Sequence, residues 1–156
     1  MGIDILPPDI NLSKEYYSIT KHNNRKAIRF GFLSIKNLGT TAIQEIMSIK
    51  NSLNYIQSVD EFFEAVNKSK VNSKVAESLI KAGVFDLFDK NRKKLLIDIK
   101  NDFYSKKNKK QKNKNQETLY SDKKPIIVTT QKDIMNYENE VFGIPLTVNY
   151  TNLLQQ

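Results

Sequence analysis

A short apolar strand, a turn and a helix start follow one another between Phe30 and Thr41. The turn has an isoleucine, two polar residues, a leucine and a glycine, from Ile35 to Gly39. The first N–H groups of a helix have no partner inside the helix, and a phosphate group is a suitable acceptor for them. The pattern therefore indicates binding chemistry that needs no reactive side chain, in which the backbone itself would hold a phosphate.

A looser version of the same pattern lies between Ile80 and Phe85, where a helix end, a glycine turn and an apolar pair follow one another. Two such turns predict a tandem pair of helix-hairpin-helix motifs that face the phosphates of duplex DNA. The candidate DNA-binding residues are Lys36, Asn37, Leu38, Gly39, Thr40 and Thr41 in the first turn, and Lys81, Ala82, Gly83 and Val84 in the second.

The first turn departs from the usual hairpin, which has glycine at both its third and fifth positions. This chain has Asn37 and Gly39 there. Asparagine is the residue after glycine that best tolerates a left-handed backbone, so we expect the turn to form. Its side chain either leaves the phosphate site open or crowds it and weakens the affinity for DNA.

The residue types of the chain argue against catalysis. Nucleotidyl transfer needs clustered carboxylates that hold divalent metal ions on a rigid scaffold, and the acidic residues are scattered instead. The absence of Cys excludes disulfides and thiolate chemistry, and the single His22 is expected in a solvated loop. We therefore predict no catalytic residue, no metal site and no cofactor.

The hydrophobic pattern indicates a soluble protein. Hydrophobic residues make up 39% of the 156 positions, enough for a small core, but no apolar run approaches the length of a membrane span. The N-terminal residues lack the layout of a signal peptide. We expect a cytoplasmic protein without a membrane partner.

The net charge of +8 comes from one segment. Residues 90–124 contain 13 Lys or Arg and 4 acidic residues, whereas the rest of the chain is close to neutral. Such a segment either attracts a phosphate backbone with strong salt dependence or is a solvated linker. Its Lys- and Asn-rich part has too few apolar residues to fold, so we expect a disordered loop.

The local patterns predict a mainly α fold with a short N-terminal β-hairpin. Residues 1–13 are expected to form an extended strap outside the core, and strands are expected at 17–20 and 27–32. Helices are predicted at about 41–50, from a capping box at Ser58, from Asn72 or Ser73 to Gly83, at 91–104, and from Thr130 to about Val141.

Longer stretches of the sequence resemble one protein family. Met1-Gly2-Ile3-Asp4-Ile5-Leu6-Pro7-Pro8-Asp9-Ile10-Asn11, the Ile28–Gly39 stretch and Leu79–Asp86 are similar, in order and spacing, to the alpha subunit of bacterial DNA polymerase III. The resemblance covers about residues 1–100. It implies the end of a fingers-like region at 1–26, a tandem helix-hairpin-helix domain at 27–104, a flexible loop at 105–124, and a helical segment at 125–156 that leads toward an oligonucleotide-binding barrel. It also implies duplex binding beside other subunits of that polymerase.

The pentapeptide Gln116-Glu117-Thr118-Leu119-Tyr120 resembles the peptide with which this family docks on its sliding clamp, the beta subunit. An amide such as that of Gln116 can bond the rim of a pocket, while Leu119 and Tyr120 enter an apolar cleft. The predicted clamp-binding residues are therefore Gln116, Leu119 and Tyr120.

Two functions remain open at this point. The first is a non-catalytic DNA-binding and clamp-binding portion of a replicative polymerase. The second is a protein-interaction module that mainly binds the clamp, as a competitor or regulator of the host polymerase, and has little affinity for DNA. Asn37 and the near-neutral hairpin region favour the second.

Overall fold

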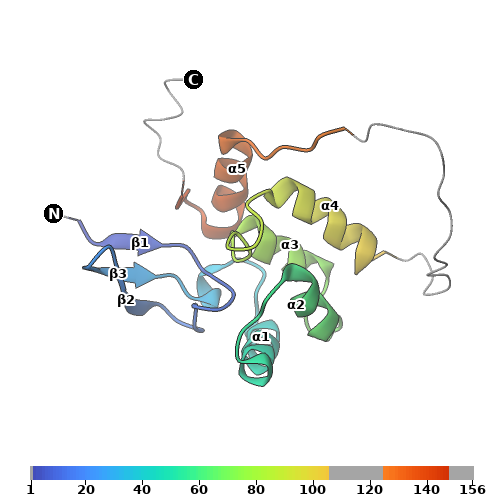
Figure 1. Ribbon diagram of the computed structural model, residues 1–156, viewed down its shortest axis with the longest axis horizontal. Helices are drawn as coiled ribbons and strands as arrows, with labels where there is room; N and C mark the ends of the chain where they lie inside the picture. Colours follow the sequence, from blue (N-terminus) through green and yellow to red (C-terminus); the bar gives the residue numbers. More distant parts are fainter. Residues whose placement is uncertain (1, 106–124, 148–156) are drawn as a thin grey trace.

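The computed structural model describes residues 2–105 and 125–147 (Figure 1). In this part of the chain, five α-helices pack beside a small three-stranded sheet, which confirms the prediction of a mainly α fold with a short N-terminal hairpin. The elements are β1 (Asp4–Leu6), β2 (Ser18–His22), β3 (Arg25–Arg29), a 3-10 turn η1 (Phe32–Ser34), α1 (Thr40–Leu53), α2 (Val59–Ala65), α3 (Ser73–Lys81), α4 (Arg92–Asp102) and α5 (Gln131–Phe142).

The sheet has the order β1-β3-β2, with β1 parallel and β2 antiparallel to β3. The predicted hairpin is confirmed as β2 and β3. Asn23 and Asn24 join these strands with φ values of 49° and 61°, the two positive angles that a type I′ turn requires. The sheet lies at one end of the molecule and leads through η1 into α1 (Figure 1).

The expectation that residues 1–13 lie outside the core is wrong. Residues 4–6 form β1, and Ile10 is fully buried, with its N–H donating to the carbonyl of Val84. The Asn11 side chain makes two hydrogen bonds with the backbone of Ile56, one as donor and one as acceptor. The segment is a structural part of the domain because an apolar residue and an amide anchor it between the helices.

Side-chain caps begin most of the helices where the sequence predicts them. Asn72, Asn91 and Thr130 each accept a hydrogen bond from a first-turn amide of α3, α4 and α5. Ser58 caps α2 in the same way, but Glu61 accepts from the amide of Gln57, where a full capping box would use that of Ser58.

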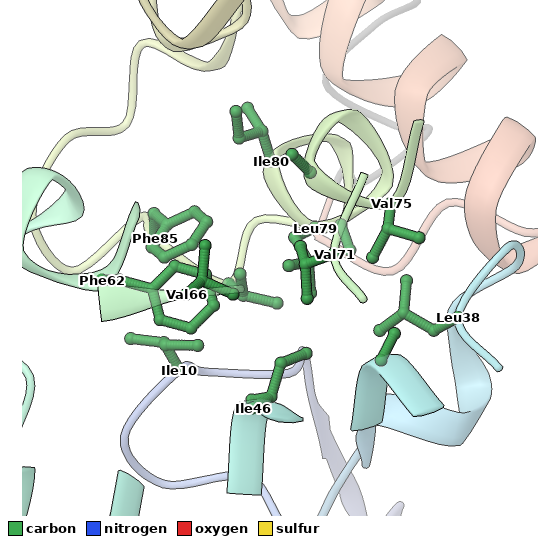
Figure 2. Packing of buried hydrophobic residues seen from close by; sticks show 14 of the residues in the cluster. Ile10, Leu38, Ile46, Phe62, Val66, Val71, Val75, Leu79, Ile80 and Phe85 are labelled. Carbon is green, nitrogen blue, oxygen red and sulfur yellow. The ribbon is translucent and has the colours of Figure 1, made fainter. Parts of the chain in front are cut away.

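The core is one cluster drawn from every helix, and Figure 2 shows its centre. Phe62, Phe63 and Phe85 form its aromatic part, with ring centroids 5.0 to 5.5 Å apart. Leu38, from the first predicted turn, projects toward Val75 of α3 in Figure 2. The first turn is therefore built on the core and is not a free loop.

Helix α5 packs against α3, a position that no local sequence pattern predicted. Val141 is fully buried, and the ring of Phe142 contacts that of Phe30 edge to face at 5.9 Å. Among the described residues, α5 is thus part of the same packed unit as the predicted hairpin domain. No helix in the described ranges has the length and apolar character that crossing a membrane would require.

Candidate nucleic-acid interface

The first turn places an uncapped helix end at the surface. Gly39 is the N-cap of α1, and no side chain of the described residues accepts a hydrogen bond from the first-turn amides of this helix. Gly39, Thr40 and Thr41 are exposed. Because α1 is 14 residues long, its N-terminus combines unpartnered N–H groups with the positive end of a helix dipole.

The space beside Gly39 is open. Its backbone is extended, with φ −89° and ψ 175°, a conformation that any residue adopts. A Cβ atom added to Gly39 would meet nothing within 4 Å. The glycine is therefore not required by the fold, and what it provides is unobstructed access to the amides that follow.

Asn37 takes the left-handed conformation that its residue type predicts, with φ 71°. Its amide nitrogen lies 3.1 Å from Ser78 Oγ on α3, to which it donates a hydrogen bond. The N–H of the preceding residue, Lys36, donates to the carbonyl of Val141 on α5 at 2.9 Å. Lys36 itself is exposed.

The second predicted turn is built differently. Ala82, Gly83 and Val84 are buried, and their amides donate to carbonyls of the preceding helix α3. Gly83 has φ 81°, so it ends α3 as predicted. Lys81 forms an ion pair with Glu140 at 3.0 Å. Ala82, Gly83 and Val84 therefore pack inside the domain next to Arg92. They do not form part of the exposed surface made by the amides of the first turn.

Sequence reasoning missed a buried ionic cluster next to this second turn. The guanidinium of Arg92 is 1% exposed, bonds both carboxylate oxygens of Asp86 at 3.0 and 2.7 Å, and donates to Glu138 of α5 at 3.0 Å. It also donates to the Lys81 carbonyl. Glu138 accepts further hydrogen bonds from the amides of Leu146 and Thr147. The cluster fastens α5 to the hairpin domain.

The electrostatics of the cluster follow from its burial. Desolvation raises the pKa of Asp86 in spite of the hydrogen bond from Arg92. Burial by itself would lower the pKa of Arg92, but the hydrogen bond and charge of Asp86 outweigh it and raise that pKa. The sequence signal for the pair of Asp86 and Arg92 was an arginine at a helix start, six residues after an aspartate. No local pattern indicated that Glu138 would join them.

The predicted clamp-binding residues Gln116, Leu119 and Tyr120, and the lysine-rich part of residues 106–124, lie outside the described residues. The chain leaves the described part after the C-terminal end of α4. It returns at the other end of that helix, where Thr129 accepts from the amide of Lys93 and donates to Asn91. Both ends of the segment are therefore attached next to α4 (Figure 1).

The described residues contain no group of three or more His, Cys, Asp or Glu side chains arranged to hold a metal ion. The carboxylates of Asp86 and Glu138 are occupied by Arg92 and by backbone amides.

Comparison with known proteins agrees with this geometry. The family model described as "Helix-hairpin-helix motif" matches residues 2–95, which is more than half of the sequence. The chain belongs to the helix-hairpin-helix family.

The relatives it matches are alpha subunits of DNA polymerase III. The subunit from Chlamydia pneumoniae is 33% identical over 161 residues that cover 94% of this chain and 13% of that protein. The subunit from Aquifex aeolicus is 37% identical over 100 residues, covering 64% of this chain and 8% of that protein. The chain is homologous to a segment of this subunit and spans about a tenth of the length of these curated relatives.

Proposed function

We propose that this chain is a non-catalytic, duplex-DNA-binding portion of a DNA polymerase III alpha subunit. The observation that carries the proposal is the uncapped N-terminus of α1, whose exposed residues Gly39, Thr40 and Thr41 lie in the first turn of a helix-hairpin-helix domain. This surface matches a phosphate group in both charge and hydrogen-bonding capacity.

Binding at this site would read no base sequence. The amides contact phosphate oxygens, and Lys36 adds one mobile positive charge beside them. Because no groove-reading side chain takes part, affinity would be similar for duplexes of different sequence. It would fall with salt because phosphate contacts release counterions.

A second contact is proposed at the sliding clamp, through Gln116, Leu119 and Tyr120. Its support is the residue pattern and its place between α4 and α5. The two side chains would bury an apolar area worth about 3 to 5 kcal/mol before ordering costs, so the peptide alone would bind weakly, on the order of micromolar.

We further propose that the chain has no polymerase activity by itself and works with other polymerase III subunits in the cytoplasm. The metal-binding carboxylate cluster that nucleotidyl transfer needs is not found among residues 2–105 and 125–147. The remaining nine tenths of the relatives' length are available for such a site.

The alternative function is a module that mainly binds the clamp and has little affinity for DNA. The near-neutral charge of the hairpin region still favours it. The other argument for it is that Asn37 crowds a bound phosphate. This argument is weakened because the side-chain amide of Asn37 donates a hydrogen bond to Ser78 on α3.

Two binding measurements on the same preparation separate these functions. A fluorescent duplex is titrated at two salt concentrations, and immobilised clamp is used to capture the chain. The proposed function predicts salt-sensitive duplex binding that Lys36→Glu combined with Gly39→Pro abolishes. The alternative predicts clamp capture that Leu119→Ala combined with Tyr120→Ala abolishes, with no measurable duplex binding. Duplex binding that is unchanged in the first double variant would contradict the assignment of the first turn.

A further inference from the structure

Asn37 lies in the part of the first turn that contacts helices α3 and α5. Three successive residues of the turn have separate tertiary anchors. The Lys36 N–H donates to Val141 of α5, the Asn37 side chain donates to Ser78 of α3, and Leu38 is buried with 8% of its surface exposed. Helix α1 begins two residues later.

The direction of the hydrogen bond between Asn37 and Ser78 is determined by a second bond. Ser78 is 3% exposed, and its hydroxyl proton is donated to the carbonyl of Lys74 at 3.0 Å. The Ser78 oxygen must therefore accept from Asn37, and only the amide nitrogen of Asn37 can donate. This fixes which way the amide group of Asn37 is turned.

The backbone of Asn37 needs this support. At φ 71° a residue with a Cβ is in a sparsely populated region, which asparagine tolerates but does not prefer. A buried acceptor on α3 holds the residue in that conformation. The same bond holds the side chain of Asn37 toward α3, whereas a phosphate would reach the α1 amides from the solvent.

We propose that Asn37 is a positioning residue for the phosphate site of the first turn. Its bond to Ser78 fixes the turn against α3, so that the amides of Gly39, Thr40 and Thr41 are held in place before a phosphate arrives. Preorganised donors bind an anion more tightly than mobile ones because less ordering is needed on binding. The proposal rests on the proposed function for its DNA readout, but its structural part does not depend on DNA.

The test uses Asn37→Gly, because glycine adopts φ 71° without strain and removes only the side chain. Ser78→Ala removes the same hydrogen bond from the other side. Each variant is expected to weaken duplex binding by about three- to tenfold, as the loss of one hydrogen bond predicts. The double variant should lose no more than either single variant, because both remove one shared contact.

Hydrogen exchange of the free proteins gives the second readout. The amides of Lys36 and Leu38, which donate to the carbonyls of Val141 and Ile35, should exchange faster in Asn37→Gly and in Ser78→Ala, while those in the centre of α4 are unchanged. If the wild type binds no duplex, the proposed function fails, but faster exchange at these amides still supports the anchoring by Asn37.

Three results would overturn the proposal. Unchanged exchange in Asn37→Gly would show that the bond does not hold the turn. Faster exchange with unchanged duplex affinity would show that holding the turn does not matter for binding. Tighter duplex binding by Asn37→Gly would show that the asparagine crowds the phosphate.

Discussion

Gly83 packs directly against the guanidinium group of Arg92. A Cβ atom at residue 83 would collide with Arg92, and would lie 2.9 Å from a carboxylate oxygen of Asp86. The glycine that ends α3 thus also makes room for the buried ion pair. Its position explains why the second turn contributes packing to the domain while the first turn contributes exposed amides.

Gly83→Ala is predicted to destabilise the domain more than Gly143→Ala. The two glycines have nearly the same φ, 81° and 79°, so the backbone strain of adding a Cβ is matched. The surroundings differ, because nothing lies within 4 Å of a Cβ at Gly143. We expect a loss of about 1 kcal/mol at Gly143 from strain alone and about 3 kcal/mol or more at Gly83, measured by urea unfolding. Equal losses would contradict the tight packing of Gly83 and Arg92.

Arg92→Met is predicted to be strongly destabilising, by about 3 to 5 kcal/mol, because it leaves the buried carboxylate of Glu138 without its cation. The matched control is Lys93→Met, which removes an exposed pair with Asp133 and is expected to cost at most about 1 kcal/mol. Unfolding curves and proteolysis at α5 measure both effects. A small loss in Arg92→Met would mean that the ionic cluster does not hold α5.

Tyr104 is predicted to ionise at a higher pH than an ordinary tyrosine. Its hydroxyl donates to the Val71 carbonyl, and burial raises its pKa to about 12. Because the folded pKa exceeds that of the unfolded chain, the hydroxyl's contribution to stability is complete below about pH 10 and is lost as the pH rises through about 12.

Tyr104→Phe isolates this contribution. The stability difference between wild type and variant should be about 0.5 to 1.5 kcal/mol at neutral pH and should shrink above pH 10. The ultraviolet phenolate titration should lose a step near pH 12 in the variant. A difference that stays constant across this pH range would contradict the assigned pKa shift.

Local patterns predicted the elements better than their assembly. The caps at Asn72 and Thr130 and the glycine that ends α3 were visible because these signals act over three or four residues. The burial of Ile10 was missed because Pro7 and Pro8 indicate extended chain but not what that chain packs against.

The candidate site was predicted in part for the same reason. A helix from about residue 41 was readable from the sequence, although α1 begins at Thr40 with Gly39 as its N-cap. The partner of Asn37 was not readable, because it is 41 residues away on α3. The second glycine turn was predicted as a looser version of the first, with a phosphate site in each. The two turns differ because Arg92 packs against Gly83, whereas no described residue lies within 4 Å of a Cβ at Gly39.

Gly39→Leu tests the central claim most directly. The extended backbone and open space at Gly39 accept a side chain without strain, so the free protein should stay folded, with a loss of about 1 kcal/mol because leucine is a poorer N-cap than glycine. The leucine would occupy the approach to the α1 amides. The matched control, Ser48→Leu, places the same side chain at an exposed position further along α1.

The decisive measurement is the affinity of wild type, Gly39→Leu and Ser48→Leu for one fluorescent duplex at low and moderate salt. We predict salt-sensitive binding by the wild type and by Ser48→Leu, and a loss of at least about tenfold in Gly39→Leu at a temperature where all three proteins are folded. Wild-type affinity in Gly39→Leu would contradict phosphate binding at the first turn.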